Sequence, residues 1–324
     1  MTPLQYLKRF LLGLPAMSRQ TGFSPARLAA AYAVSYIFHG ANSEEFCALR
    51  LYEMTNKRRS QFLLYRDTVR FSDALNAGAS KEELACFDDK YLFNQTFRAF
   101  IRRDWLYLPE SSVEDVQAFL RRNATFLAKE RVSTQGKGIT KHAAADTDAA
   151  AFMAQRQGQP LLLEAFLTQH PAMAAPNPST VNTVRIQTAR KGDEVILLGG
   201  CMRCGGADAF VDNFHKGGVA YPLDMATGIV TGPGRTLKGD ALYIRHPSTG
   251  HTMPGFQVPF WEELVSTVRR AAVTVPHVGY VGWDVAVTPD GPELIEGNIN
   301  YPDPIVVQLD GGGRYQTLKA FAKP

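Results

Sequence analysis

The sequence has few cysteines and no long apolar run. Its 324 residues include 4 cysteines, without the close spacing of a small disulfide-linked domain, and this scarcity predicts a reducing, cytoplasmic setting. No stretch approaches the roughly 20 apolar residues that a transmembrane helix requires. Cys201 and Cys204 form a lone CxxC motif. Without a second pair or a histidine at ligand spacing, they are better explained as apolar strand positions than as zinc ligands.

A strong charge of either sign is also missing. Lys and Arg number 35 against 31 Asp and Glu, which gives a net charge of +4. The positive excess lies before residue 125, largely in residues 56–60 and in the arginine pairs at 102–103 and 121–122. This field is too weak to predict nucleic-acid binding, so we expect these residues on solvated helix faces.

The segment MTPLQYLKRFLLGLPAMSRQ imitates a signal peptide, but its apolar core is minimal and its cleavage site is poor. It is interpreted instead as an amphipathic helix in which Leu4, Leu7, Phe10 and Leu11 share one face. That face is expected to pack on the core of the protein. Contact with a membrane surface is the less favoured alternative.

From residue 24 to 105 the pattern is helical. Ser24 suits an N-cap, Pro25 the first helical position and Gly40 the stop of one helix. Beyond residue 105, extended segments alternate with single helices, and no internal repeat is evident. This alternation predicts α+β layers rather than a doubly wound parallel sheet. Further helices are predicted over 42–71, 87–103 and 258–275, and a long hairpin over 179–204.

The turn TPDGP lies within the stretch GWDVAVTPDGPELIEGNIN, residues 282–300. Proline and aspartate suit the centre of a type I turn, and the glycine suits the left-handed position that follows. A three-residue loop of this kind predicts a hairpin in which Thr288 lies opposite Pro292.

Counting back from that register places Asp284 opposite Glu296, with Asn298 on the same face of the hairpin. Directly opposed carboxylates about 5 Å apart repel one another unless a positive charge lies between them. A hard cation such as Mg²⁺ would explain the three oxygen-bearing side chains. A solvated sheet face with scattered acids explains them as well, and the hairpin alone leaves both interpretations open. Replacing Asp284 with alanine should weaken binding of the cation while it raises or spares the stability of the fold, because it removes like-charge repulsion.

Basic residues elsewhere could hold the phosphates that accompany such a cation. Lys129 ends a strand that runs into STQGKGI, whose glycines would let backbone N–H groups approach an anion, although a plain surface turn explains them too. Arg185 and Arg203 each interrupt an apolar strand. A three-residue loop at 191–193 would put both arginines on one sheet face, and a two-residue loop would separate them.

Four longer segments carry a resemblance to a known family. EAFLTQHPAMAAPNPSTVNTVRIQT, FVDNFHKGGVAYPLD, HPSTGHTMPGFQVPFWEEL and VGWDVAVTPDGPELIEGNINYPD resemble the sugar-transfer-associated ATP-grasp family, relatives of glutamate-ligase-like proteins. The resemblance runs from about residue 85 onward. It implies an α+β ATP-grasp fold with ATP between two subdomains, a lid subdomain at 86–160 and a large subdomain with the metal site at 161–324. A helical region at 1–85 precedes them, where family members commonly begin with a Rossmann-like domain.

The resemblance also implies roles for single residues. The metal ligands for Mg²⁺ are Asp284, Glu296 and Asn298. The residues expected to contact ATP are Lys129, the lid residues Gln135, Gly136, Lys137 and Gly138, the hinge residues Leu163 and Glu164, and Lys90, which is equally well explained as a helix-terminus charge. Arg185 and Arg203 would face the γ-phosphate or the substrate carboxylate, and Asp212, Asn213 and His215 lie in a loop that could contact the acceptor.

The implied reaction is ATP-dependent ligation of a carboxylate to an amine through an acylphosphate, on an amino acid, a sugar or a peptide. Polysaccharide or secondary-metabolite tailoring is the favoured context. A kinase of the same fold and a non-catalytic nucleotide-binding scaffold are the alternatives. ADP release that depends on both a carboxylate and an amine would favour the ligase over the kinase. An intact metal-binding set argues against the scaffold.

Overall fold

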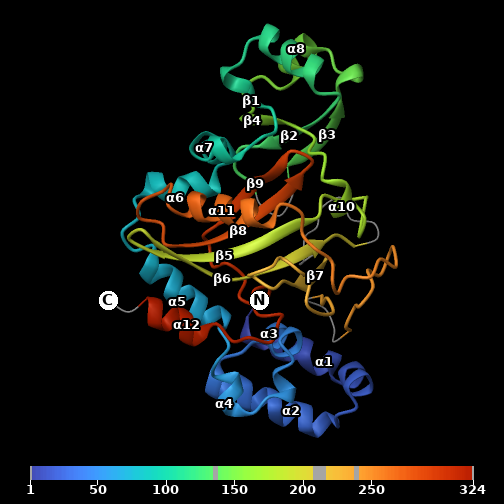
Figure 1. Ribbon diagram of the computed structural model, residues 1–324, viewed down its shortest axis with the longest axis vertical. Helices are drawn as coiled ribbons and strands as arrows, with labels where there is room; N and C mark the ends of the chain where they lie inside the picture. The colour runs from blue at the N-terminus through green and yellow to red at the C-terminus, as the bar shows by residue number, and fades with distance from the viewer. Residues whose placement is uncertain (1, 134–137, 207–216, 237–240, 323–324) are drawn as a thin grey trace.

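The computed structural model describes residues 2–133, 138–206, 217–236 and 241–322. Its strands form two antiparallel sheets, a smaller one ordered β1-β4-β2-β3 and a larger one ordered β7-β6-β5-β8-β9. Figure 1 shows the smaller sheet above the larger one, with the N-terminal helices below both. The strands are β1 (Trp105–Tyr107), β2 (Thr125–Glu130), β3 (Ile139–Ala143), β4 (Leu161–Ala165), β5 (Thr183–Lys191), β6 (Glu194–Cys204), β7 (Val219–Pro222), β8 (Tyr280–Thr288) and β9 (Gly291–Asn298).

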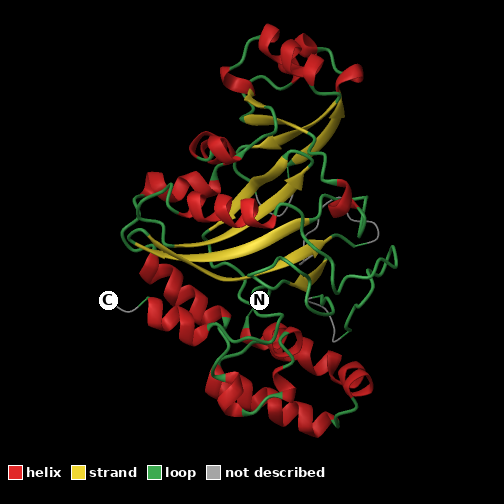
Figure 2. Ribbon diagram, viewed as in Figure 1, coloured by secondary structure: helices red, strands yellow, loops and turns green. Residues whose placement is uncertain are grey.

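Helices cover both sheets, as the red and yellow layers of Figure 2 show, and the predicted α+β class is confirmed. Before β1 they are α1 (Pro3–Thr21), α2 (Pro25–Val34), η1 (Ser35–His39), α3 (Ser43–Ala48), η2 (Leu51–Glu53), α4 (Asn56–Arg59), α5 (Tyr65–Leu75), α6 (Lys81–Asp88), α7 (Lys90–Thr96) and η3 (Arg98–Phe100). After β1 they are η4 (Leu108–Glu110), α8 (Val113–Arg122), η5 (Ala144–Asp146), α9 (Ala149–Gln155), α10 (Pro171–Ala174), α11 (Trp261–Ala272) and α12 (Tyr315–Phe321).

Local capping explains the boundaries of α2. The Ser24 hydroxyl accepts the backbone N–H of Arg27 at 3.3 Å, and Pro25 occupies the first helical position. The helix passes into the π-helical turn η1 and stops at Gly40, which adopts the left-handed φ of 72°. The predicted start and stop of this segment are therefore confirmed.

The first helix docks on a different face from the one expected. Phe10 is buried and its ring stacks on Tyr32 with centroids 4.2 Å apart. Leu4, Leu7 and Leu11 are instead exposed. The prediction that all four apolar residues pack on the core is wrong for these three leucines, because α2 and α3 contact α1 on the side of Phe10 and Met17.

The larger sheet separates two layers of apolar side chains. Val184, Ile186 and Trp283 point toward α11, where they pack with Leu264 and Val268. Alternate residues of the same strands point to the opposite face. On that side the N-terminal helices, α5, α12 and the segment 305–309 cover parts of the sheet.

The smaller sheet has its own core. Phe119 from α8 and Phe126 from β2 pack edge to face at 5.9 Å, and α9 adds Phe152. Leu161 and Leu163 of β4 join the same cluster. Although β4 begins at residue 161, it lies in the centre of the smaller sheet, between β1 and β2.

Candidate functional site

The β8–β9 hairpin has a shorter loop than the sequence predicts. Thr288 pairs with Gly291, not with Pro292, so the loop contains two residues rather than three. A register shift next to Asp284 adds one residue to β9, and this β-bulge restores the pairing of Asp284 with Glu296. The predicted loop register is thus wrong, while the predicted opposition of the two acids is confirmed.

The β5–β6 hairpin repeats this arrangement. Lys191 pairs with Glu194, which leaves a two-residue loop that alone would put Arg185 and Arg203 on opposite faces. A register shift at Gln187 corrects the alternation, so that Arg203 lies opposite Thr183. Both arginines therefore share the sheet face that points away from α11.

Asp284 lies at the centre of that face and is buried at 2% exposure. Arg185 donates to both of its oxygens, with Nη2 2.7 Å from Oδ2, and Arg203 Nη2 lies 2.9 Å from the same oxygen. Arg203 is positioned in turn by the Thr183 hydroxyl, at 3.1 Å from Nε. Burial opposes ionisation of Asp284, but the two guanidinium groups lower its pKa to about 2.

We therefore expect that removing Asp284 destabilises the fold, contrary to the expectation from the sequence, because two buried cations would lose their partner.

Glu296 has the opposite electrostatic character. Its side chain is exposed, but desolvation by the surrounding protein raises the pKa of the carboxyl group. Repulsion from the neighbouring Asp284 carboxylate raises this pKa further. Its pKa is raised to about 6, and the two carboxyl groups share a hydrogen bond. The Asn298 amide donates to Glu296 Oε1 at 3.3 Å, so the three predicted metal ligands lie together.

This donor set fits a hard cation. Asp284 and Glu296 are opposed across the hairpin, and carboxylate and amide oxygens are the ligands that Mg²⁺ prefers. In the part of the chain that the structure describes, no group of three or more His, Cys, Asp or Glu forms a separate metal site.

Lys90, Lys129 and Glu164 form a second charged cluster at the smaller sheet. Lys129 on β2 is paired with Glu164 on β4, and Lys90 at the start of α7 donates to the Ser133 carbonyl at 2.7 Å. Burial and the charge of Lys129 lower the pKa of Lys90, against the attraction of Glu296 and Glu164. Lys90 therefore lies near enough to Glu164 and to Glu296 for both carboxylates to act on its pKa.

The buried Arg103 joins the two sheets and was missed as a site residue. Its guanidinium binds Glu164 through Nε at 3.0 Å and Glu293 of β9 through Nη1 at 3.0 Å. Asn94 of α7 donates to the other oxygen of Glu164 at 2.8 Å. Burial alone would raise the pKa of Glu164, but the charges of Arg103 and Lys129 hold it well below its usual range. The expectation that Arg103 lies on a solvated face is wrong.

The remaining predicted site residues either lie apart from this cluster or fall outside the residues that the structure describes. The backbone of Leu163 is flanked by β1 and β2, because β4 is a central strand. Gly138 adopts φ 64° and lies against the Glu130 side chain. Residues that fall outside the described part of the chain are Gln135, Gly136, Lys137, Asp212, Asn213 and His215.

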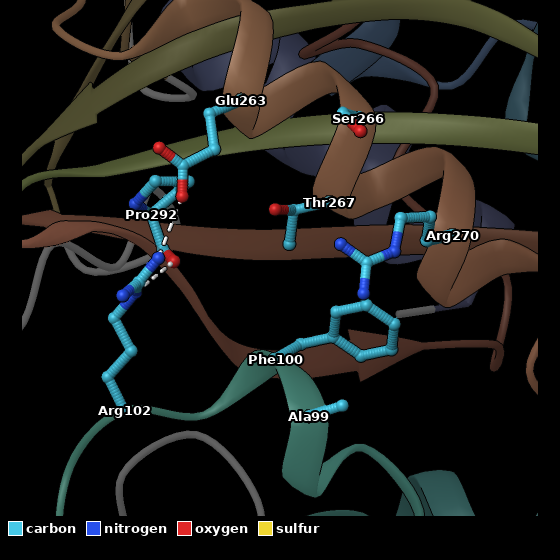
Figure 3. A pocket seen from close by; sticks show the side chains of 8 residues that line it. All are labelled: Ala99, Phe100, Arg102, Glu263, Ser266, Thr267, Arg270 and Pro292. Atoms are coloured by element: carbon cyan, nitrogen blue, oxygen red, sulfur yellow. Dashed lines mark hydrogen bonds and ion pairs between the residues drawn. The ribbon is translucent and has the colours of Figure 1, made fainter.

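A small pocket opens on the other side of the larger sheet (Figure 3). Its volume is about 180 Å³, which is smaller than the roughly 300–1,000 Å³ of small-molecule sites. Its charged groups already have partners, since Arg102 pairs with Glu263 at 2.7 Å and Arg270 lies 5.1 Å from the Phe100 ring centroid. The Asp284 face is therefore a better candidate for the functional site than this pocket.

Comparison with known proteins places the chain in a family. The model of the sugar-transfer associated ATP-grasp family matches residues 70–323, which is most of the chain. The chain belongs to this family, within the ATP-grasp superfamily. A search of curated proteins finds no match.

Several solved structures align with this chain at low similarity. D-alanyl-alanine synthetase A from Vibrio cholerae aligns at 12% identity and a TM-score of 0.46, over 74% of this chain and 65% of that one. The ATP-grasp ligase PsnB, solved with minimal precursor, Mg and ADP, aligns at 16% identity and 0.43, over 83% and 70%. Carboxyaminoimidazole ribonucleotide synthase from Aspergillus clavatus, complexed with ATP, aligns at 11% and 0.43, over 68% and 47%, so this chain spans about half the length of that relative.

Proposed function

We propose that this protein is an ATP-dependent ligase that joins a carboxylate to an amine through an acylphosphate, in the cytoplasm. The observation that carries the proposal is the convergence of Arg185, Arg203, Asp284 and Glu296 on one sheet face, within electrostatic reach of Lys90. Membership of the ATP-grasp family supports the nucleotide. The scarcity of cysteine, 4 in 324 residues, suits a reducing compartment.

The charges of the site divide into two roles. Lys90 and Lys129 would hold the phosphates of ATP, and exchange of Glu164 for a phosphate would free the Lys129 ammonium for that contact. Glu296, Asn298 and Asp284 would hold Mg²⁺, which supplies positive charge to the bound phosphates. Leu163 and Glu164 remain the proposed contacts to the nucleoside.

The reaction needs few covalent steps from the protein. A substrate carboxylate oxygen attacks the γ-phosphorus, the bond to ADP breaks, and Arg185 and Arg203 offset the charge on the transferring phosphoryl group. The amine then attacks the acyl carbon, phosphate leaves with the bonding pair, and the nitrogen loses a proton to solvent. Asp284 pairs with both guanidinium groups in the structure, and one of these contacts would give way to Mg²⁺.

Substrate trapping tests the proposed reaction. With ATP, Mg²⁺ and a panel of amino acids, uronic acids and peptides, hydroxylamine should intercept the acylphosphate and give a hydroxamate from the true carboxylate. ADP release should require the carboxylate. ADP formation without any hydroxamate, together with a stable phosphorylated product, would show a kinase of the same fold instead.

The raised pKa of Glu296 predicts a pH dependence. Protons and Mg²⁺ compete for the same carboxyl group, so at limiting Mg²⁺ the rate of ADP release should fall as the pH drops through about 6. Excess Mg²⁺ should restore most of the rate at pH 5.5. A rate that stays constant from pH 7.5 to 5.5 at limiting Mg²⁺ would contradict the assignment of Glu296 as a metal ligand.

A further inference from the structure

The N-terminal helices carry a concentration of exposed apolar side chains. Of the 14 large apolar residues that are exposed in the structure, 7 lie before residue 40. Several are almost fully open, with Leu4 and Leu12 at 74% and Phe38 at 69% exposure. We call this set the apolar face; it consists of Leu4, Leu7, Leu11, Leu12, Tyr36, Ile37 and Phe38.

The leucines of this face form a stripe along α1. At 100° per residue, Leu4, Leu7 and Leu11 fall within about 60° of one another, and Leu12 borders them. The buried Phe10 and Met17 lie on the other side of the helix, which leaves this stripe turned away from the protein. The side of α1 that carries Phe10 and Met17 already packs on α2 and α3, so the leucine stripe is a second apolar surface of the same helix.

The aromatic part of the face directly follows α2, which packs against α1. The connection at residues 22–24 turns the chain back, and the stacking of Phe10 on Tyr32 sets α1 and α2 side by side. The Tyr32 ring also lies 6.2 Å from the ring of Tyr36, the first aromatic residue of this part of the face. Figure 1 shows both helices at the far end of the molecule from the smaller sheet.

The charged side chains that border the apolar stripe of α1 are basic, while the acid that contacts this helix, Glu44, is paired with Arg9. Residues 1–43 contain four basic residues and no Asp or Glu. Lys8 and Arg19 are exposed and fall on the same side of α1 as Leu11 and Leu12. An apolar stripe bordered by lysine and arginine, with no acid among them, matches a surface of apolar chains beneath anionic head groups.

We propose that the apolar face binds an anionic lipid surface, with α1 lying in the interface and the ATP-grasp sheets held in solution beside the membrane. Self-association does not suit this face as well, because a two-fold contact would set Lys8 and Arg19 of the two copies against each other with no acid from this segment to pair them. In the described residues no helix is long and apolar enough to cross a membrane, so the contact is peripheral. The proposal is independent of the reaction proposed above.

Vesicle flotation with the full chain tests this surface. The wild type should float with vesicles of 70% phosphatidylcholine and 30% phosphatidylglycerol, bind pure phosphatidylcholine at least roughly tenfold more weakly, and be released by high salt. Replacing Leu7 and Leu11 together with serine should weaken binding to the anionic vesicles roughly tenfold or more, since both leucines would enter the interface. Lys8→Glu should do the same.

Matched controls separate this face from general stickiness. The double replacement of Leu242 and Ile244 with serine removes exposed apolar groups elsewhere, and Lys81→Glu reverses a distant exposed charge; neither should change vesicle binding. All of the variants should keep the wild-type thermal unfolding temperature. Wild-type protein that stays unbound at low salt would overturn the proposal. So would a concentration-dependent dimer that the Leu7 and Leu11 replacement dissociates, since a second copy would then cover the face.

Discussion

Replacing Glu296 with glutamine should abolish most Mg²⁺-dependent turnover while it preserves the fold. The side chain keeps its shape but loses the negative charge that competes for a cation, and removal of one such electrostatic contact typically lowers the turnover rate roughly 10²- to 10³-fold. The same change should stabilise the protein without metal. The folded-state pKa of Glu296 is about 6, above that of an unfolded carboxyl, so at neutral pH the ionised group opposes folding.

Two measurements separate these effects. ADP release at saturating Mg²⁺ and ATP reports the loss of turnover, and thermal unfolding without metal should show a rise of roughly 1–2 °C, because solvent around the exposed carboxylate reduces the repulsion. Glu262→Gln, which makes the same chemical change on the exposed side of α11, should alter neither. If the Glu296 variant turned over at the wild-type rate, the metal would have to bind elsewhere.

The pairing of the acids could be predicted from sequence, but its physical basis could not. Turn chemistry favours a three-residue loop at TPDGP, which gives the correct partner for Asp284 in the wrong loop register. A shorter loop and a bulge produce the same alternation, because each changes the register by one residue. Beyond the bulge, side chains alternate in the same way for a three-residue loop as for a two-residue loop with a bulge. The sequence pattern therefore does not distinguish these two hairpins.

The two arginines show the same compensation. From the sequence, Arg185 and Arg203 could share a face only if the loop at 191–193 held three residues. The structure has a two-residue loop and a bulge, and both side chains reach Asp284. A bulge in each of two neighbouring hairpins suggests that these sites re-aim strands toward one face, as bulges near active sites commonly do.

The burial of charged side chains is the feature that the sequence predicts least well. Arg102 and Arg103 are adjacent and chemically identical, yet Arg102 is 44% exposed and Arg103 only 6%. No periodicity separates them, because they follow η3 in a short irregular link where neither helical nor strand alternation applies. The partners of Arg103 lie 61 and 190 residues away in the chain, so only the tertiary fold brings them together.

Replacing Arg103 with alanine should lower the free energy of unfolding by about 3–5 kcal/mol, because it leaves buried Glu293 without its cation and Glu164 with Lys129 alone. Glu164 and Glu293 are 2% and 1% exposed, so water cannot replace the guanidinium without opening the structure. Urea unfolding monitored by tryptophan fluorescence measures the change. Arg102→Ala is the matched control and should cost less than about 1 kcal/mol, since its partner Glu263 is 46% exposed.

A second readout tests whether Arg103 also sets the geometry between the sheets. It binds β4 beside the proposed nucleoside contacts and β9 three residues before Glu296, so its loss should let the two sets of ligands shift relative to each other. At a temperature where the variant remains folded, the KM for ATP should rise more than kcat falls, because binding requires both sheets at once. Equal stability losses in the Arg102 and Arg103 variants, with an unchanged KM, would contradict both the stabilising role of Arg103 and its role in positioning the two sheets.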